Sequence, residues 1–312
     1  MQGLATTVPT AYYRFLLKVT LITIAVSIFL VALGGVVRVT GSGLACPDWP
    51  LCQGQVLPPA ERGTTLEFAH RLTATAVGSL VLGIALYSMR VRREAASIFY
   101  AAVLSGVLVL AQIVLGAVVI FAKLSAIIVT AHLGLATAFI GVLAVIAGQA
   151  SLRLRSSEQS PDAARRTTRA TLVAAVLTYA ALLLGAYVAT SGSSLACPQW
   201  PLCNNTLIPT GDWRQWIGLI HRILAAAMTL AVIWATWTAY AAKAPRLVRG
   251  LLHGAAALTV IEIIVGALNP ILLVPPAVAV AHLTIATVIW ILLTGAATIS
   301  MSANRRDIPA GT

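Results

Sequence analysis

Charged residues are scarce in this chain. They make up 10% of its 312 residues, and only nine residues are Asp or Glu, whereas 59% are hydrophobic. Soluble domains carry about 25% charged and roughly 45–50% apolar residues. The chain therefore lacks the polar residues that a water-soluble surface needs, and its composition predicts a protein of the lipid bilayer.

Eight apolar stretches are long enough to cross a membrane. A transmembrane helix needs about 20 mainly apolar residues to cross about 30 Å of hydrocarbon. We therefore predict an all-α integral membrane protein with eight transmembrane helices in contact with membrane lipid. The stretches lie near residues 17–37, 68–89, 97–121, 126–149, 170–190, 216–241, 249–270 and 277–300.

The net charge of +12 would suggest nucleic-acid binding in a soluble protein, but the placement of the basic residues indicates otherwise. Fifteen of the 21 lie at helix ends or in loops on one side of the eight-helix arrangement. By the positive-inside rule this side is the cytoplasm, and both termini lie there. Orientation and attraction to anionic lipid explain these residues, so we expect no nucleic-acid partner. They are Arg14, Lys18, Arg90, Arg92, Arg93, Arg153, Arg155, Arg165, Arg166, Arg169, Lys243, Arg246, Arg249, Arg305 and Arg306.

Cysteine and histidine are also rare, with four and five residues, yet nearly all of them fall in a repeated pattern. The segment Cys46–Cys52 recurs as Cys197–Cys203, and a His-Arg pair follows each segment after 18 residues. A second histidine lies 62 or 61 residues after the first. The chain is therefore two copies of a unit of about 150 residues. The four repeated histidines are His70 and His132 in the first copy and His221 and His282 in the second.

The repeat defines the domain organisation. An even number of spans gives both copies the same orientation, so we expect a pseudo-twofold axis along the membrane normal. We predict an N-terminal four-helix bundle over residues 1–150 and a C-terminal four-helix bundle over residues 170–312. The Ser/Arg-rich segment 151–169, which contains a Pro-Asp turn, is the predicted cytoplasmic linker.

All four cysteines fall in two predicted extracytoplasmic loops, 38–66 and 191–215. Disulfides form in such oxidising compartments. The spacing of five intervening residues differs from the spacing of two in zinc and thioredoxin-like sites. A local disulfide closing so short a loop would contribute about 2–3 kcal/mol, which favours a structural role. A redox role of the first pair is the alternative. The predicted pairs are Cys46 with Cys52 and Cys197 with Cys203.

The four repeated histidines lie at a similar depth near the outer face. His70 and His221 open the second and sixth spans, and His132 and His282 lie about six residues into the fourth and eighth. An isolated histidine in an apolar helix is usually a hydrogen-bonded core residue, but duplication favours ligands. Two inward-facing histidines on different helices can supply both axial ligands of a haem iron. We therefore expect one haem in each bundle.

Two features near the histidines bear on this interpretation. Two imidazoles alone would leave a zinc or copper ion under-coordinated, so haem is favoured over a bare metal. Arg71 and Arg222, beside the histidines, are placed to pair with haem propionates, although snorkelling to the interface explains them equally well. His253 has an apolar counterpart in the first copy and is left out of the haem sites.

These motifs together resemble the haem A synthase family over roughly residues 15–300. The resemblance implies a bacterial membrane-bound oxidoreductase that oxidises a methyl group of haem O to the formyl group of haem A for terminal oxidases. It also implies haem b as a cofactor in one half and the substrate haem in the other. The implied partners are haem O synthase, oxidase assembly factors and an electron acceptor of unspecified kind. The motifs are Glu67-Phe-Ala-His70-Arg71, His221-Arg222, Thr130-Ala-His-Leu133, Ala281-His-Leu283 and the paired-cysteine loops.

Differences between the two copies indicate which half carries out the chemistry. Charged groups at membrane depth are costly unless they are used or paired. Around the first loop and the His-Arg pair, the charged groups that differ between the copies lie in the first copy. Glu67 aligns with Gly218, Arg38 with Ala189, and Asp48 with Gln199. One pair is reversed, since Glu262 of the second copy aligns with Gln112 of the first. We therefore predict that the N-terminal bundle binds the substrate haem through His70, His132 and Arg71. The C-terminal bundle then holds haem b through His221 and His282, with Arg222 at a propionate.

Glu67 is the predicted catalytic residue. It precedes His70 by three residues and so shares its helical face. The alternative is a capping box from Thr64 to Glu67, but the sixth span has Gly218 at the matching position and its own cap signal at residues 212–215. Other functions that use similar bundles are a di-haem b electron carrier or quinone oxidoreductase and a haem transporter.

Overall fold

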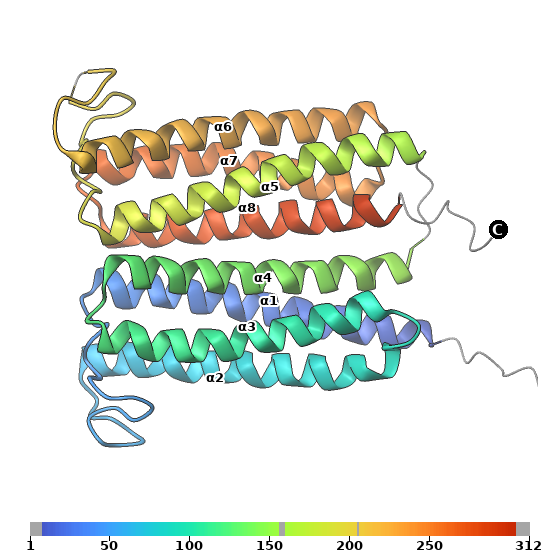
Figure 1. Ribbon diagram of the computed structural model, residues 1–312, viewed down its shortest axis with the longest axis horizontal. Coiled ribbons are helices and arrows are strands. Elements are labelled where there is room, and N and C mark those ends of the chain that lie inside the picture. Colours follow the sequence, from blue (N-terminus) through green and yellow to red (C-terminus); the bar gives the residue numbers. More distant parts are fainter. Residues whose placement is uncertain (1–7, 156–159, 205, 304–312) are drawn as a thin grey trace, which may run out of the picture.

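The computed structural model describes residues 8–155, 160–204 and 206–303, and eight long helices account for most of them (Figure 1). All eight are long and apolar enough to cross a membrane, and no strand occurs in the described part of the chain. The predicted fold class is therefore confirmed. The helices are α1 (Thr10–Val39), α2 (Arg62–Ser88), α3 (Ala96–Phe121), α4 (Ala126–Arg153), α5 (Pro161–Thr190), α6 (Trp213–Ala241), α7 (Arg246–Ile271) and α8 (Pro276–Ala303), and the 3-10 turn η1 (Met89–Val91) follows α2.

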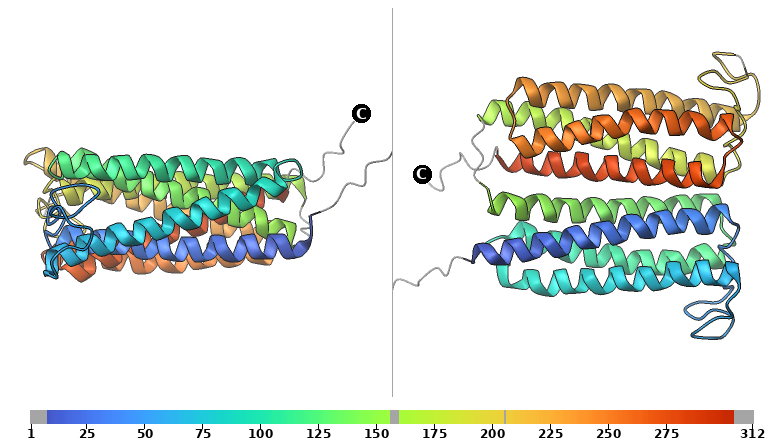
Figure 2. Two further views of the ribbon diagram at one scale, coloured as in Figure 1. Left: turned by 90° about the horizontal axis from the view of Figure 1, so that it is seen from below. Right: turned by 180° about the vertical axis from the view of Figure 1, so that it is seen from behind.

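Helices α1 to α4 form one four-helix bundle and α5 to α8 form a second one beside it (Figures 1 and 2). Large apolar side chains such as Leu230 and Trp237 are exposed on the outside, where they would meet lipid. Small buried residues, including Ala174 and Ala235, line the helix contacts. Small residues allow the close helix approach that stabilises bundles in membranes.

The two bundles contact each other through equivalent helices of the repeat. Helices α1 and α4 pack against α8, and α5 and α8 pack against α4. Trp290 and Tyr179 of the second bundle donate hydrogen bonds to the backbone carbonyls of Thr137 and Gly134 on α4, at 2.8 and 2.9 Å. These contacts fix the two bundles side by side, with the first and last described residues at one end and both cysteine loops at the other (Figure 1).

The helices extend into the segment 151–169 that was predicted as the linker. Helix α4 continues to Arg153 and α5 begins at Pro161, so the connection is shorter than predicted. The reason is local, because Ser160 accepts a hydrogen bond from the backbone N–H of Ala163 and caps α5, and proline is favoured in the first helical turn. Residues 156–159 of that segment, and the basic residues Arg305 and Arg306, lie outside the described residues.

Candidate functional site

The four repeated histidines lie within the first three turns of α2, α4, α6 and α8, at the end that bears the cysteine loops. In the described chain α2 does not approach α4, and α6 does not approach α8, so each pair spans the diagonal of its bundle. The ring centroids of His221 and His282 are 6.4 Å apart, with an angle of 89° between the rings. His253 is exposed on α7.

Each histidine ring packs against a glycine of the preceding helix. A Cβ atom added to the glycine would lie only 2.8–3.3 Å from the ring Cε1, whereas carbon atoms pack best at about 3.5–4.0 Å. A larger residue at these positions would therefore force the histidine ring to shift. The sequence reasoning missed these residues, although they too are 151 or 150 positions apart. The pairs are Gly34 with His70, Gly116 with His132, Gly185 with His221, and Gly266 with His282.

A carboxylate of the neighbouring helix approaches one ring nitrogen of His282, whereas the buried Nδ1 atoms of His70 and His221 have no hydrogen-bond partner among the described residues. The carboxylate of Glu262 lies 2.9 Å from Nδ1 of His282. An acceptor at one ring nitrogen is the usual companion of a metal ligand at the other, because it fixes the tautomer and the orientation of the ring.

Gln112 makes a different contact with the fourth histidine. Its amide nitrogen donates to the backbone carbonyl of His132 at 3.0 Å and lies 3.1 Å from the ring Nε2 of the same residue. A carbonyl only accepts hydrogen bonds, so the contact identifies the amide group as the donor. The ring nitrogen Nε2 of His132 is therefore the acceptor of the second hydrogen bond.

Both cysteine loops contain the predicted disulfides. Cys46 is bonded to Cys52 and Cys197 to Cys203, with Cα atoms 4.5 and 4.6 Å apart, and the Trp-Pro peptide bond inside each loop is cis. Asp48 belongs to the first loop only and accepts hydrogen bonds from the backbone N–H groups of Gln53 and Gly54 at 2.6 and 2.8 Å. These hydrogen bonds, that from Gly54 foremost, lower the pKa of the Asp48 carboxyl.

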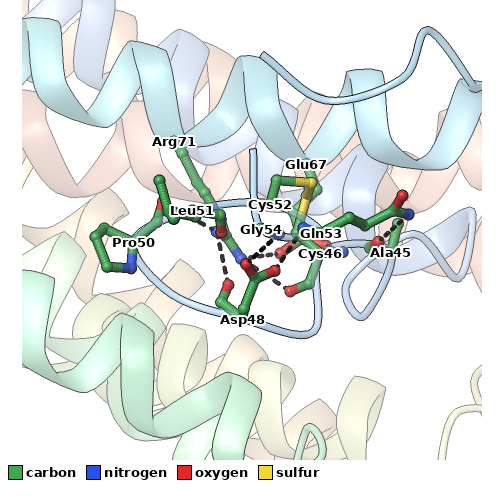
Figure 3. Close-up of polar contacts among 10 residues, drawn as sticks. All are labelled: Ala45, Cys46, Asp48, Pro50, Leu51, Cys52, Gln53, Gly54, Glu67 and Arg71. Carbon is green, nitrogen blue, oxygen red and sulfur yellow. Dashed lines mark hydrogen bonds and ion pairs between the residues drawn. A yellow bond between two sulfur atoms is a disulfide. The ribbon is translucent and has the colours of Figure 1, made fainter. Parts of the chain in front are cut away.

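Arg71 and Arg222 hold the two loops against the helices that follow them. Figure 3 shows the Arg71 guanidinium among loop carbonyls, where it donates to Leu51 at 2.6 Å and to Cys46 and Asp48 at 3.0 Å. Arg222 donates in the same way to Cys197, Pro201 and Leu202. The loop carbonyls thus take most of the donors that the sequence reasoning assigned to propionates. A propionate contact of either arginine stays a prediction.

Glu67 is buried at the junction of α2 and the first loop, with 4% of its surface exposed. One carboxylate oxygen lies 2.6 Å from the Arg71 guanidinium, and the other accepts a hydrogen bond from the backbone N–H of Cys46 at 2.8 Å (Figure 3). The alternative role as a capping box with Thr64 is therefore wrong, because α2 already begins at Arg62 and the Thr64 hydroxyl donates to carbonyls of preceding residues.

The sixth span lacks this carboxylate but keeps the surrounding structure. A Cβ atom at Gly218 would lie 3.8 Å from Sγ of Cys197, so the matching position also faces the disulfide. The cap signal at residues 212–215 is present, since Asp212 accepts from the backbone N–H of Arg214 and Gln215 accepts from that of Gly211. The carboxylate of Glu67 is therefore an addition to the N-terminal bundle that helix formation does not require.

Comparisons with known proteins agree with this architecture. A family model described as cytochrome oxidase assembly protein, COX15-CtaA, matches residues 18–294. A protein of Shouchella clausii named heme A synthase is 32% identical over 221 residues, which cover 68% of this chain and 72% of that protein. A heme A synthase of Symbiobacterium thermophilum is 31% identical over 242 residues, covering 72% of this chain and 76% of that protein.

The chain belongs to the haem A synthase family. The resemblance drawn from the sequence motifs is thus confirmed, and with it the interpretation as a multi-pass membrane oxidoreductase. The matched region includes all four repeated histidines, both disulfides and Glu67. In this member of the haem A synthase family the features absent from the sequence analysis are tertiary contacts, namely those of the glycines with the histidine rings and those of Arg71 and Arg222 with the loop carbonyls.

Proposed function

We propose that the protein oxidises a methyl group of haem O to a formyl group, which gives haem A for terminal oxidases. The observation that carries this proposal is a carboxylate present in one bundle only, one helical turn from a histidine that recurs in both. In a chain of the haem A synthase family, this asymmetry supports the assignment of the chemistry to the N-terminal bundle and of the cofactor to the C-terminal one.

Haem extraction tests this function. Membranes of a bacterium that makes haem O but cannot convert it should contain haem A once this chain is expressed, and the purified protein should carry haem b beside haem O or haem A. Haem b alone, with unchanged haem O in the membranes, would instead identify a di-haem electron carrier. Haem O bound without conversion would identify a transporter.

The C-terminal bundle is the proposed site of haem b, with His221 and His282 as axial ligands. One metal ion between two imidazoles needs a bond of about 2 Å on each side, which corresponds to about 6 Å between ring centroids. The observed 6.4 Å fits this arrangement. Among the described residues no group of three or more His, Cys, Asp or Glu could hold a metal ion by itself, which favours a metal whose other ligands belong to a macrocycle.

The N-terminal bundle is the proposed substrate site, with haem O held by His70 and His132. Converting a methyl group to a formyl group replaces two C–H bonds by a C=O bond. With water as the source of the oxygen atom, the conversion releases four protons and four electrons, so it requires a proton acceptor at the site and an electron acceptor. Glu67 lies on the helical face of His70 and is the carboxylate placed to accept protons there. Arg71 fixes that carboxylate through their 2.6 Å ion pair.

The same proposal fixes the orientation in a bacterial cell membrane. The basic residues that lie at the end of both termini indicate the cytoplasm, so the disulfide loops and the four histidines lie toward the extracytoplasmic side. The disulfides close these loops, and Arg71 and Arg222 hold the loops against α2 and α6. The substrate would reach the N-terminal bundle from a haem O synthase in the same membrane, and oxidase assembly factors would receive the product.

A test of the haem b site uses the glycine beneath His221. Gly185→Ala should reduce the content of low-spin haem b, because the new Cβ would lie 2.8 Å from Cε1 of His221 and overpacking of this kind costs about 1–3 kcal/mol. Gly250→Ala on α7 is the control, since no atom lies within 4 Å of its Cβ position. The absorbance of reduced haem per polypeptide measures the effect. Equal haem content in both variants would contradict the proposed ligand.

A further inference from the structure

Gln112 and Glu262 occupy the same position in the two copies and contact the corresponding histidines differently. They lie on α3 and α7, 150 residues apart, and each faces the histidine of the next helix. The carboxylate of Glu262 approaches Nδ1 of His282, whereas the amide of Gln112 donates toward Nε2 of His132. The two contacts thus involve different nitrogens of the imidazole ring and opposite hydrogen-bonding partners.

Glu262 has no evident structural reason to be acidic. It is buried, with 7% of its surface exposed, in the middle of an apolar helix. Its second carboxylate oxygen has no hydrogen-bond partner among the described residues, and the contact with His282 is the one ionic contact that the structure gives it. A buried carboxylate is costly unless it is paired, so we infer that Glu262 is acidic because it interacts with His282.

The two contacts have opposite consequences for iron binding. A carboxylate 2.9 Å from Nδ1 attracts the ring proton to that nitrogen, even where the contact is an ion-pair distance and not an aligned hydrogen bond. It thereby leaves the Nε2 lone pair free for a metal and increases the basicity of the ring. An amide that donates to Nε2 uses the same lone pair that the metal needs, and it must be displaced before iron binds there. Nε2 of His282 is therefore free to bind iron, whereas Nε2 of His132 already accepts a hydrogen bond from the Gln112 amide.

We propose that this single position makes His282 a permanent ligand and His132 an exchangeable one. Glu262 is a positioning residue that orients His282 and strengthens its electron donation, so that it lowers the reduction potential of the haem in the C-terminal bundle. Gln112 is a positioning residue that competes with iron for His132, so that the haem in the N-terminal bundle can leave after it has been modified. This inference rests on the proposed function and on the ligand assignment given there.

The first experiment measures the potential of haem b in purified holoprotein with Glu262→Gln. Glutamine keeps the size and one acceptor oxygen but removes the charge, so bound haem should remain low-spin and become easier to reduce. Outer ligands of metal sites typically have effects of at least about tenfold. We expect a shift of about tenfold in the ratio of ferrous to ferric haem at fixed potential, or about 59 mV for one electron. An unchanged potential would overturn the role of Glu262.

The second experiment uses Gln112→Leu and follows the release of haem O from the N-terminal bundle to an excess of apomyoglobin. Leucine has a similar size but neither donates nor accepts a hydrogen bond, so Nε2 of His132 becomes free for iron and haem O should leave at least about tenfold more slowly. Release at the wild-type rate or faster would overturn the role of Gln112.

If Glu262→Gln lost its haem during purification, the potential of the Glu262→Asp variant, which restores the charge, should match that of the wild type. A raised potential in Glu262→Asp would also count against the proposal.

Failure of this inference differs from failure of the proposed function. If the C-terminal bundle bound no haem, the wild-type protein would either lack the low-spin signal or keep it when both His221 and His282 are replaced. If the ligands are correct but Glu262 is only structural, the wild type shows the signal and the charge-removing variant shifts haem content without shifting the potential.

Discussion

Protein with Glu67→Gln will keep its low-spin haem b and accumulate haem O, or a hydroxylated form of it, with little haem A. Glutamine retains the size of the side chain but loses the base, and such proton transfer typically contributes about 10²–10⁴-fold in rate. Arg71 keeps its acceptors on Cys46, Asp48 and Leu51, and the disulfide still closes the loop. The measurement is the ratio of haem A to haem O extracted from the purified variant.

The structure also offers a competing explanation that the same experiment must separate. Glu67 bonds to Cys46 and Arg71, so its loss could act through the loop rather than through the chemistry. Asp48→Asn is the matched control, because Asp48 accepts two backbone hydrogen bonds within the same loop and does not touch Glu67. We expect Asp48→Asn to make haem A at close to the wild-type rate. If both variants lost haem A equally, Glu67 would be an anchor of the loop and not the base.

The second large effect concerns haem b. Replacing His221 or His282 with alanine should abolish the low-spin haem b spectrum while the polypeptide stays in the membrane, because a low-spin bis-histidine iron needs both imidazole ligands. His253→Ala is the control, since His253 is exposed on the outer face of α7 and distant in sequence from the ligand positions. Absorption spectra of reduced and oxidised protein, normalised to polypeptide, give the occupancy.

The double variant decides the assignment of the two bundles. Protein with both His221 and His282 replaced should contain no low-spin haem b, although it still carries His70 and His132. A full bis-histidine spectrum in that protein would show that the N-terminal bundle holds the cofactor and would reverse the proposed roles.

The sequence was sufficient to predict the fold because the determining signals are local or repeated. Composition predicted the bilayer, and eight apolar stretches predicted the eight helices, which the structure contains. The ends of the helices were less accurate, as at α4 and α5, where polar residues extend each helix beyond its apolar core. A hydropathy window detects the part of a helix in hydrocarbon, whereas the helix itself ends where capping and backbone hydrogen bonds end.

The site was predicted only as far as its chemistry is visible in residue types. The histidines and cysteines are rare, so their repeat identified them. Gly34 and Gly185 carry no chemistry, and their importance follows from a ring on another helix that lies against them. The sequence reasoning also assigned Arg71 to a propionate, because the carbonyls that it contacts belong to a loop whose path depends on its disulfide and turns. Contacts of this kind arise from tertiary packing, so the recurrence of these residues in both copies does not by itself reveal what they contact.

The surface between the bundles, where α4 meets α8, has a consequence for how the two halves could differ. Two separate copies of one four-helix unit that met through this surface would form a symmetric dimer, in which every residue occurs in both partners. A glutamate gained for one task would then appear in both sites. Joining the copies in tandem removes that constraint, because each half can change alone. Glu67 opposite Gly218, and Glu262 opposite Gln112, are differences that a dimer of identical copies could not hold, and they allow the two bundles to take different roles.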